Sequence, residues 1–432
     1  MATHFKSTIL LLAATFVLQA ATHATERTDI LYTQPIGGTL VRDIGNNRSI
    51  ICDKTGGNSN TPSFTMFIPG SSTLSLIIID VDTIFDFEVF NDNVFFCGVK
   101  NNATGGYGVL GYFPLAGFPS TTVNYLKVSL FRRVRKLEVG YMMGHTHIIA
   151  IGDGIHGRAE LVDAVDLGTT WNMNFFDASD DAPMFIDLAI TDNYVVVAAI
   201  VNEGITCRAR IYYFDKPTTP LGTLGPTNVP WRDIYDEASA DIIIESCTGN
   251  AFVVAIASGV NVIFNTRFII VAYDAFNHIS TNHLVENTPL AKLEDIEYEK
   301  STKVLELMLY INDGDTKYSV IYTLIPAMAT SNLNAAGHLF YDICLSSLDK
   351  CSAQSNHFIA IGNYKLGANY MVHVLYDFNQ WDRCSEYTEN MIVKRDPFVD
   401  IGELAFGHVD YTQNPTTYIP SDKTVNTFIS CK

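Results

Sequence analysis

The chain has 432 residues, of which 47% are hydrophobic and 12% aromatic, and its formal net charge at pH 7 is −18. This length allows two or three ordinary domains or one large repetitive domain. The negative charge repels phosphate, which argues against nucleic acid and anionic membrane surfaces as partners.

Residues 1–24 have the composition of a secretory signal peptide. A short segment with one Lys precedes the apolar run TILLLAATFVLQA, and the small residues ATHA follow it. We expect cleavage after Ala24, with no Cys at the junction to carry a lipid anchor. No later segment reaches about 18 uninterrupted apolar residues. The sequence therefore predicts an exported protein (periplasmic, cell-surface or extracellular) that does not insert into a membrane.

The cysteines fit an oxidising compartment but do not form a metal-binding pattern. No Cys-x-x-Cys or zinc-type pair occurs, so we predict no metal and no cofactor. The sequence is compatible both with disulfides and with free thiols buried on strands. The eight cysteines are Cys52, Cys97, Cys207, Cys247, Cys344, Cys351, Cys384 and Cys431.

An internal repeat organises most of the chain. The segment DFEVFNDNVFFCGVKNNATGGYGVLGYF, which begins at Asp86, reads as a strand, a tight turn, an apolar strand, a Gly/Asn loop and a third strand. A period near fifty residues with three or four strands is typical of propeller blades. The second strands are almost continuous apolar runs, as expected where both faces are covered. Related units begin at Lys136, Phe185, Ala240, Leu293 and Tyr341, with second strands near Val94, His147, Tyr194, Phe252, Val304 and His357.

These units predict an all-β fold in which residues 25–432 form a single β-propeller of four-stranded antiparallel blades. Weaker fourth strands are expected from Asn124, Trp171 and Met391. The two ends, Thr39–Asp82 and Phe398–Cys431, also contain strands. If they combine, with N-terminal strands completing a C-terminal blade, the ring has seven blades and no free edge. If each end forms its own blade, the count is eight; we predict seven.

The segment VFFCG…GYGVLGYF resembles a sequence pattern that recurs in uncharacterised exported β-propeller proteins of Bacteroidetes. The resemblance covers the blade pattern over most of the mature chain. It implies a propeller fold and export, and it implies no activity, because that family has none assigned.

The segment AVDLGTTW resembles the Asp box, S-x-D-x-G-x-T-W, without its leading Ser. This hairpin recurs in sialidases and related propellers. There the Asp and Thr side chains satisfy turn amides and the Trp packs between blades. The resemblance implies a structural role for Asp166, Gly168, Thr170 and Trp171, on the face opposite the usual pocket. Only one box occurs and no Arg-Ile-Pro segment precedes the blades, which argues against sialidase activity.

The segment FRRVRK is a dense basic cluster in an acidic chain. We place it on a loop at the channel mouth, the face where propellers usually bind ligands. Arg132 and Arg135 are the candidate contacts to an anionic ligand, with His156 from a neighbouring loop. The alternative is an ion pair with Asp180 and Asp181.

Other polar motifs have simpler interpretations. His145 and His147 are expected to form a surface pair rather than a metal site. The segment NDGD at 312–315 is expected to form a hairpin turn rather than a calcium loop. Trp231 and Trp381 are expected to pack between blades.

No catalytic motif such as G-x-S-x-G, HExxH or a P-loop occurs in a supporting context, and catalytic residues stay unassigned. Whether the protein is an enzyme stays open, and the sequence favours a non-enzyme. Our first hypothesis is a binding or scaffold protein that recognises a glycan or peptide at the channel mouth. We expect this ligand to be anionic. The alternatives are a glycoside hydrolase or lyase of propeller fold and a structural subunit of a surface assembly.

Overall fold

The computed structural model describes a large part of the chain. The described residues are 29–32, 40–46, 48–53, 61–68, 73–102, 105–155, 159–178, 183–203, 206–219, 222, 224–225, 228–235, 238–261, 266–274, 279–286, 291–313, 316–324, 333–341, 343–350, 357–366, 368–377, 386–395, 401–413, 415–418 and 422–431.

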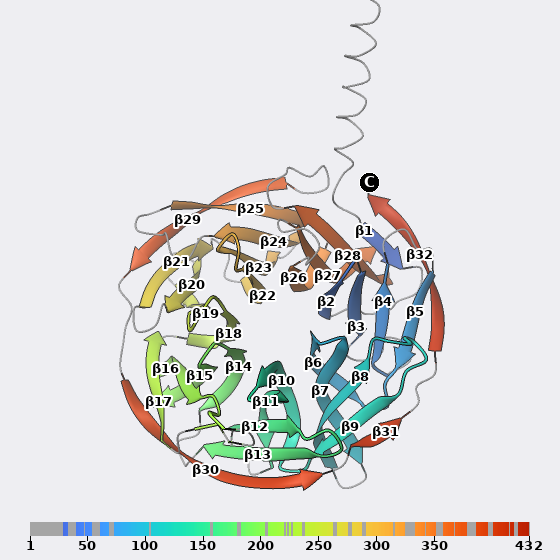
Figure 1. Ribbon diagram of the computed structural model, residues 1–432. Helices are drawn as coiled ribbons and strands as arrows, with labels where there is room; N and C mark the ends of the chain where they lie inside the picture. The colour runs from blue at the N-terminus through green and yellow to red at the C-terminus, as the bar shows by residue number, and fades with distance from the viewer. Residues whose placement is uncertain are drawn as a thin grey trace, which may run out of the picture.

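The protein is an all-β propeller whose antiparallel blades surround a central axis (Figure 1). Each blade runs from an innermost strand outward. The blades are β2 (Leu40–Gly45), β3 (Arg48–Asp53), β4 (Ser63–Phe67), β5 (Thr73–Ile78); β6 (Thr83–Phe90), β7 (Asn93–Asn102), β8 (Gly105–Pro114), β9 (Val123–Val128); β10 (Phe131–Met142), β11 (His145–Gly154), β12 (Ala159–Asp166), β13 (Trp171–Ala178); β14 (Met184–Ile190), β15 (Tyr194–Glu203), β16 (Thr206–Asp215), β17 (Asn228–Tyr235); β18 (Ala238–Ser246), β19 (Phe252–Asn261), β20 (Thr266–Asp274), β21 (Ile279–Glu286); β22 (Ala291–Glu299), β23 (Val304–Asp313), β24 (Thr316–Leu324), β25 (Leu333–Tyr341); and β26 (Ile343–Lys350), β27 (His357–Leu366), β28 (Ala368–Asp377), β1 (Asp29–Tyr32).

The C-terminal strands form a belt around the outside of the ring, drawn in red in Figure 1. Each belt strand continues the sheet of one or two blades at their outermost strand. For this reason the blades merge into three nine-stranded sheets and one five-stranded sheet among the described residues. The belt consists of β29 (Glu386–Arg395) on β21 and β25, β30 (Ile401–Gln413) on β13 and β17, β31 (Thr416–Tyr418) on β9, and β32 (Asp422–Cys431) on β5 and β1.

N-terminal and C-terminal strands do combine in one sheet, because β32 pairs with both β5 and β1. The segments 39–82 and 398–431 do not form one blade together, as we had expected. The segment 40–78 forms a four-stranded blade of its own, and the short β1 pairs with β28 to supply the fourth strand of the last blade. The segment after Phe398 supplies belt strands rather than a blade, and Met391 lies in the belt strand β29 instead of a fourth strand. The physical reason is that an outermost strand leaves N–H and C=O groups unpaired, and a belt strand pairs with them.

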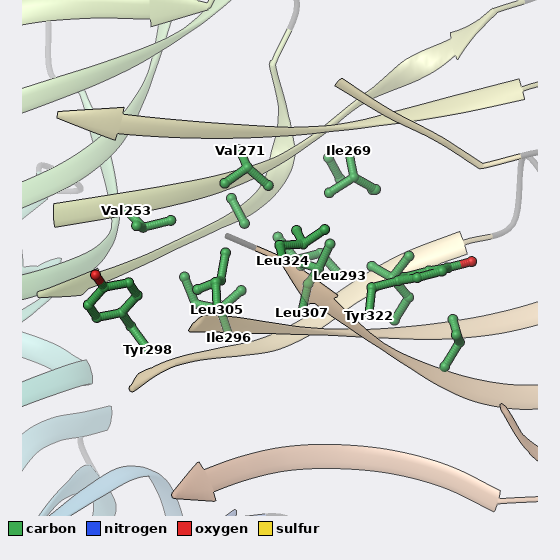
Figure 2. Close-up of a cluster of buried hydrophobic side chains, with 14 of the residues drawn as sticks. Val253, Ile269, Val271, Leu293, Ile296, Tyr298, Leu305, Leu307, Tyr322 and Leu324 are labelled. Atoms are coloured by element: carbon green, nitrogen blue, oxygen red, sulfur yellow. The ribbon is translucent and has the colours of Figure 1, made fainter. Parts of the chain in front are cut away.

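The hydrophobic core lies between neighbouring blades, which explains the continuous apolar second strands. In β19, Val253 and Ala255 belong to the cluster shared with the β22–β25 blade. Their neighbours Val254 and Ile256 belong to the cluster shared with the β14–β17 blade. Figure 2 shows the first cluster, where Val253, Ile269 and Val271 face side chains of β22–β24. Because successive side chains of a strand point to opposite faces, both faces of each inner blade are buried.

Two glycines of the second strands are required by bulges in the innermost strands. The register of β6 shifts between Ile84 and Asp86, and a Cβ atom at Gly98 of β7 would overlap the carbonyl oxygen of Thr83. The register of β10 shifts in the same way before Lys136, and a Cβ at Gly152 would overlap the carbonyl oxygen of Arg133. Bulges redirect side chains, and here they set which residues face the axis.

The structure also bears on membrane-spanning helices and on the cysteines. Within the described residues, no helix has the length and apolar character needed to cross a membrane. Cys207, Cys247 and Cys344 are free thiols, and Cys247 is buried. The predicted signal peptide, residues 1–24, lies outside the described residues.

Candidate functional site

The innermost strands present acidic side chains to the axis at one equivalent position. In β6, Asp86 and Glu88 line the central cavity while Phe87 between them is fully buried. The triplet Lys136-Leu137-Glu138 of β10 repeats this arrangement. The acids at the position of Glu88 come from five innermost strands and are called here the carboxylate ring. The carboxylate ring consists of Glu88, Glu138, Glu245, Glu297 and Asp349.

In three innermost strands, the residue directly before that buried apolar position is an aspartate that connects neighbouring blades. Asp86 accepts a hydrogen bond from the backbone N–H of Leu137 in the next blade at 3.3 Å. Asp187 accepts one from Ile244 at 3.0 Å, and Asp295 one from Leu348 at 2.8 Å. These three side chains are therefore structural, because each ties its innermost strand to the next one.

Members of the carboxylate ring differ in their partners. Arg42 of β2 binds Glu88, with its Nε and Nη2 atoms 2.9 and 2.7 Å from the same carboxylate oxygen. Asp349 accepts a hydrogen bond from the backbone N–H of Asp43. Within the described residues, Glu138, Glu245 and Glu297 have neither a hydrogen bond nor an ion pair. Three carboxylates thus face the cavity without a protein donor.

The cavity enclosed by the innermost strands has a volume of about 220 Å³ and a charged lining. The lining contains eight carboxylates, which are the carboxylate ring together with Asp86, Asp187 and Asp295. The basic side chains of the lining are Arg42, Lys136, Lys300 and Lys350. Lys136 lies 3.5 Å from Asp187 and 3.9 Å from Asp86, measured from Nζ to the carboxylate oxygens. The lining therefore has twice as many carboxyl groups as basic side chains.

Burial makes ionisation of these carboxylates difficult. Burial, followed by repulsion from Glu88, raises the pKa of Glu245 to about 8. Burial also raises the pKa of Asp349 to about 7, against the attraction of Arg42, and that of Asp187 to about 6. The pKa of Glu138 lies well above its ordinary value because of burial and of the neighbouring Glu88 and Glu245. Acids of this kind hold protons near neutral pH. They release the proton to a base, or to solvent when a positive charge comes close.

The predicted basic cluster lies on a strand, not on a loop. Residues 131–136 open β10, an innermost strand, and Lys136 already lines the cavity. The segment is a strand because its buried positions Phe131 and Val134 pack into the core shared with the preceding blade. Arg132, Arg133 and Arg135 precede Lys136 on β10 and are called here the rim arginines; they are not among the residues that line the cavity.

The rim arginines converge on one carboxylate. Arg133 forms an ion pair with Asp153 of β11, and Nη2 of Arg135 lies 2.9 Å from the same carboxylate oxygen. Arg132 is exposed and donates through Nη2 to the carbonyl oxygen of Ile155 at 3.1 Å. Burial opposes ionisation of Asp153, but hydrogen bonds from Arg135 and Arg133 lower its pKa. The partner is thus Asp153 of the same blade.

Four residues singled out in the sequence lie outside the described residues. They are His156, the lesser candidate contact, the alternative partners Asp180 and Asp181, and Trp381. Trp231 lies in β17 and stacks with Arg210, whose guanidinium carbon is 3.5 Å from the ring centroid.

The expectation of a surface histidine pair is wrong for His147. This residue is 1% exposed, and its Nδ1 lies 2.8 Å from Oδ1 of Asp163, a carboxylate that is fully buried. Burial raises the pKa of Asp163 although the contact with His147 opposes the shift. His145 is half-buried, with Nδ1 2.9 Å from the carbonyl oxygen of Asp166. The two side chains therefore have separate partners. His147 is buried rather than at the surface because β11 is covered on both faces.

The Asp box residues form a tight turn between β12 and β13. Asp166 accepts a hydrogen bond from the N–H of Gly168 at 2.7 Å, and Gly168 has a φ of +88°. The N–H of Leu167 donates to the carbonyl oxygen of Thr170 at 2.9 Å. Trp171 is 2% exposed, and its ring centroid lies 5.5 Å from that of Tyr112 in the preceding blade. These contacts belong to a turn and to the inter-blade core rather than to the cavity.

Replacing Trp171 by Ala is therefore expected to reduce the free energy of unfolding by about 3–5 kcal/mol, the usual range for a buried aromatic side chain. Asp166→Ala removes one turn hydrogen bond and is expected to cost about 1 kcal/mol. Urea unfolding followed by circular dichroism measures both. Any ligand affinity of the refolded variants should equal that of the wild type; loss of binding at unchanged stability would place the ligand site on this face.

No group of three or more His, Cys, Asp or Glu side chains within the described residues is arranged to hold a metal ion. The carboxylate ring is therefore spread around the cavity rather than gathered at one point.

Sequence reasoning missed the carboxylate ring, although the repeat contained a signal for it. Aligning the repeat units would have placed the triplets DFE, KLE, IIE, DIE and SLD at the same point of five first strands. An acid one residue beyond a buried apolar position on an innermost strand must face the axis.

Comparison with known proteins shows similarity to solved structures. No family model and no curated protein matches the chain. Among solved structures, the chain is similar to an ulvan lyase of polysaccharide lyase family PL25 bound to -[GlcA(1-4)Rha3S]-. The TM-score is 0.42 at 9% sequence identity, and the alignment covers 79% of this chain and 94% of that chain.

Proposed function

We propose that this protein is an exported binding protein that holds an anionic glycan or peptide at the mouth of its central channel. Its export rests on the composition of residues 1–24. The observation that carries the ligand assignment is the convergence of Arg133 and Arg135 on the single carboxylate of Asp153, beside the exposed Arg132.

The rim keeps positive charge after its internal ion pairs are formed. Two guanidinium groups share one carboxylate, and the side chains of Arg133 and Arg135 are 48% and 40% exposed. Arg132 donates to a backbone carbonyl oxygen, which leaves its charge without a carboxylate. The Nε atom of Arg135 is buried and has no hydrogen-bond partner. Guanidinium groups bind carboxylate and sulfate through two parallel hydrogen bonds. The rim is therefore suited to a carboxylated or sulfated ligand, although the whole protein repels anions.

We also infer that the ring has seven blades. The innermost strands β2, β6, β10, β14, β18, β22 and β26 contact one another in this order, and β26 contacts β2. An eighth blade would require the C-terminal segment to fold as a blade, whereas its strands pair along the outer edges of the others.

The function is tested by calorimetric titration of uronic-acid, sulfated and neutral oligosaccharides into the wild-type protein and the Arg132→Ala/Arg135→Ala variant. We expect the wild type to bind a charged oligosaccharide, with weaker binding at high salt because exposed charges are screened beyond about 10 Å at 0.1 M. The double variant should lose at least about tenfold in affinity, by the usual worth of one charge-assisted hydrogen bond.

The control is Lys127→Ala/Lys292→Ala, which removes two exposed positive charges elsewhere. Equal affinity in the wild type and the rim variant, or binding to neutral oligosaccharides alone, would refute the proposal.

A second candidate function is glycoside hydrolysis or elimination. It is favoured by Glu138 and Glu245, two cavity carboxylates whose raised pKa values suit a proton donor. Release of new reducing ends or of an unsaturated product during the same titrations would favour this function over binding alone.

A further inference from the structure

Two β-bulges shape the start of β10, where the rim arginines lie. In the pairing of β10 with β11, Arg132 and Arg135 have no residue opposite them, so each is the extra residue of a bulge. The bulge at Arg135 has counterparts in β6, β14, β22 and β26. Among these described pairings, only that of β10 has an additional bulge, at Arg132. Bulges redirect side chains and are frequent beside active sites, so this segment has a local geometry that those four strands lack.

Asp153 of β11 is the shared partner of Arg133 and Arg135. Its Oδ2 atom accepts a hydrogen bond from Nε of Arg133 and another from Nη2 of Arg135, the latter at 2.9 Å. The place of this carboxylate is fixed by the strand pairing, because Asp153 lies opposite Arg133 and follows Gly152, where a Cβ atom would overlap the bulged backbone. One negative charge therefore holds two positive side chains together.

The shared carboxylate leaves most donors of the two guanidinium groups unengaged. A guanidinium group carries five N–H donors. Within the described part of the chain, the side chain of Arg133 donates only through Nε and that of Arg135 only through Nη2. Nε of Arg135 is buried, which leaves its Nη1 and the two Nη atoms of Arg133 for a ligand. An anion can therefore bind both arginines while Asp153 stays in place.

Two opposing effects decide how Asp153 influences the binding of an anion. Its charge repels the anion, but its side chain is 31% exposed, and an exposed charge pair changes an affinity by up to about fivefold. Without Asp153, the two guanidinium groups would repel each other and the ligand would have to order both side chains. Ordering one long side chain weakens binding by about two- to twelvefold, and the effect is multiplied for two. The ordering effect is the larger one, so Asp153 should favour binding.

We propose that Asp153 is the positioning residue of the anion site, which holds Arg133 and Arg135 side by side for the ligand. The anionic group binds to the outer N–H groups of the two arginines and makes no contact with Asp153. Arg132, the extra residue of the additional bulge, supplies a third positive charge beside them. This inference rests on the proposed function, because it concerns how the same site binds its ligand.

The test is calorimetric titration of sulfated maltohexaose, whose only charged groups are sulfate esters, into the wild-type protein, Asp153→Ala and Asp153→Glu. Asp153→Ala should bind about tenfold more weakly than the wild type, as expected when two side chains lose their order. Asp153→Glu keeps a carboxylate and should recover most of the affinity. The matched control Asp80→Ala removes a carboxylate that is 56% exposed and paired with Lys100, and it should bind like the wild type.

A double-mutant cycle separates positioning from a purely structural role. In the Arg133→Ala background only one of the two positioned side chains remains, so Asp153→Ala should weaken binding by no more than about threefold. A loss of the same size in both backgrounds would overturn the proposal, and so would an affinity of Asp153→Ala that equals or exceeds that of the wild type.

The Arg132→Ala/Arg135→Ala variant distinguishes failure of this inference from failure of the proposed function. Equal affinity in that variant and the wild type, or no binding to the wild type, overturns the proposed function and this inference with it. Binding that depends on these arginines but is unaffected by Asp153→Ala overturns this inference alone.

Discussion

Deletion of residues 398–432 is expected to abolish the single cooperative unfolding transition of the protein. The deletion removes the belt strands β30, β31 and β32, which together pair with the outer strands of five blades. We expect the thermal midpoint to fall by at least about 10 °C, given the usual 2–4 °C per kcal/mol for chains of this order of size. We also expect the transition to broaden.

The expected effect is large because the belt adds backbone pairing between blades that otherwise meet through their apolar cores and through single side-chain contacts of the innermost strands. β30 pairs along the whole of β13, from Trp171 to Ala178, and continues onto β17. Without β30, both blades would expose a row of unpaired backbone groups. Deletion of β32 also removes one of the two strands that hold β1 in place.

Differential scanning calorimetry measures the midpoint and the cooperativity. As a control, a peptide comprising residues 398–432 is added to the truncated protein and should restore part of the lost stability, because the outer strands remain available for pairing. A truncated protein with the wild-type midpoint and an equally sharp transition would contradict the role given to the belt.

The stability of the protein is expected to decrease as the pH rises from about 5 to about 9. The groups responsible are Asp187, Asp349 and Glu245, whose pKa values in the folded protein are about 6, about 7 and about 8. In the unfolded chain they return to the ordinary range near 4. Unfolding at neutral pH therefore releases protons from these groups.

The direction of the effect follows from this proton release. A carboxyl group whose pKa is higher in the folded than in the unfolded state stabilises the folded protein fully at pH values below its unfolded pKa. This stabilisation is lost as the pH rises through the folded pKa. The thermal midpoint should fall across the interval from pH 5 to pH 9 in steps that follow these three groups. The pKa of Asp153 is lowered, so this residue stabilises the folded state above its unfolded pKa. Its contribution is lost only in acid, outside the interval from pH 5 to pH 9.

Thermal denaturation at constant ionic strength measures this dependence. Glu245→Gln should raise the midpoint at pH 9 and change it little at pH 5, since the wild-type side chain is then already protonated. The control Asp192→Asn removes an exposed carboxylate and should leave the slope unchanged. A midpoint that stays constant or rises toward pH 9 in the wild type would contradict the assignment of these pKa values.

The sequence by itself determined the propeller fold and the positions of its second strands. Continuous apolar runs beginning at Tyr194, Phe252, Val304 and His357 became β15, β19, β23 and β27 with those same first residues. The reason is local, because a strand covered on both faces needs apolar residues at successive positions, and turn residues mark its ends. The turn between β12 and β13 was likewise readable, because its contacts lie within a few residues of each other.

Only the tertiary structure decided how the ends of the chain are used and which polar groups meet at the axis. The belt strand β30 pairs with β13, more than two hundred residues earlier in the chain, and nothing in its own pattern specifies that partner. The carboxylate ring assembles from five repeat units, and each unit contributes one acid that is unremarkable alone. Bulges in the innermost strands turn these side chains inward. Register shifts and long-range pairing depend on the neighbouring blade, and this is why the rim arginines, read as a loop, are the start of a channel strand.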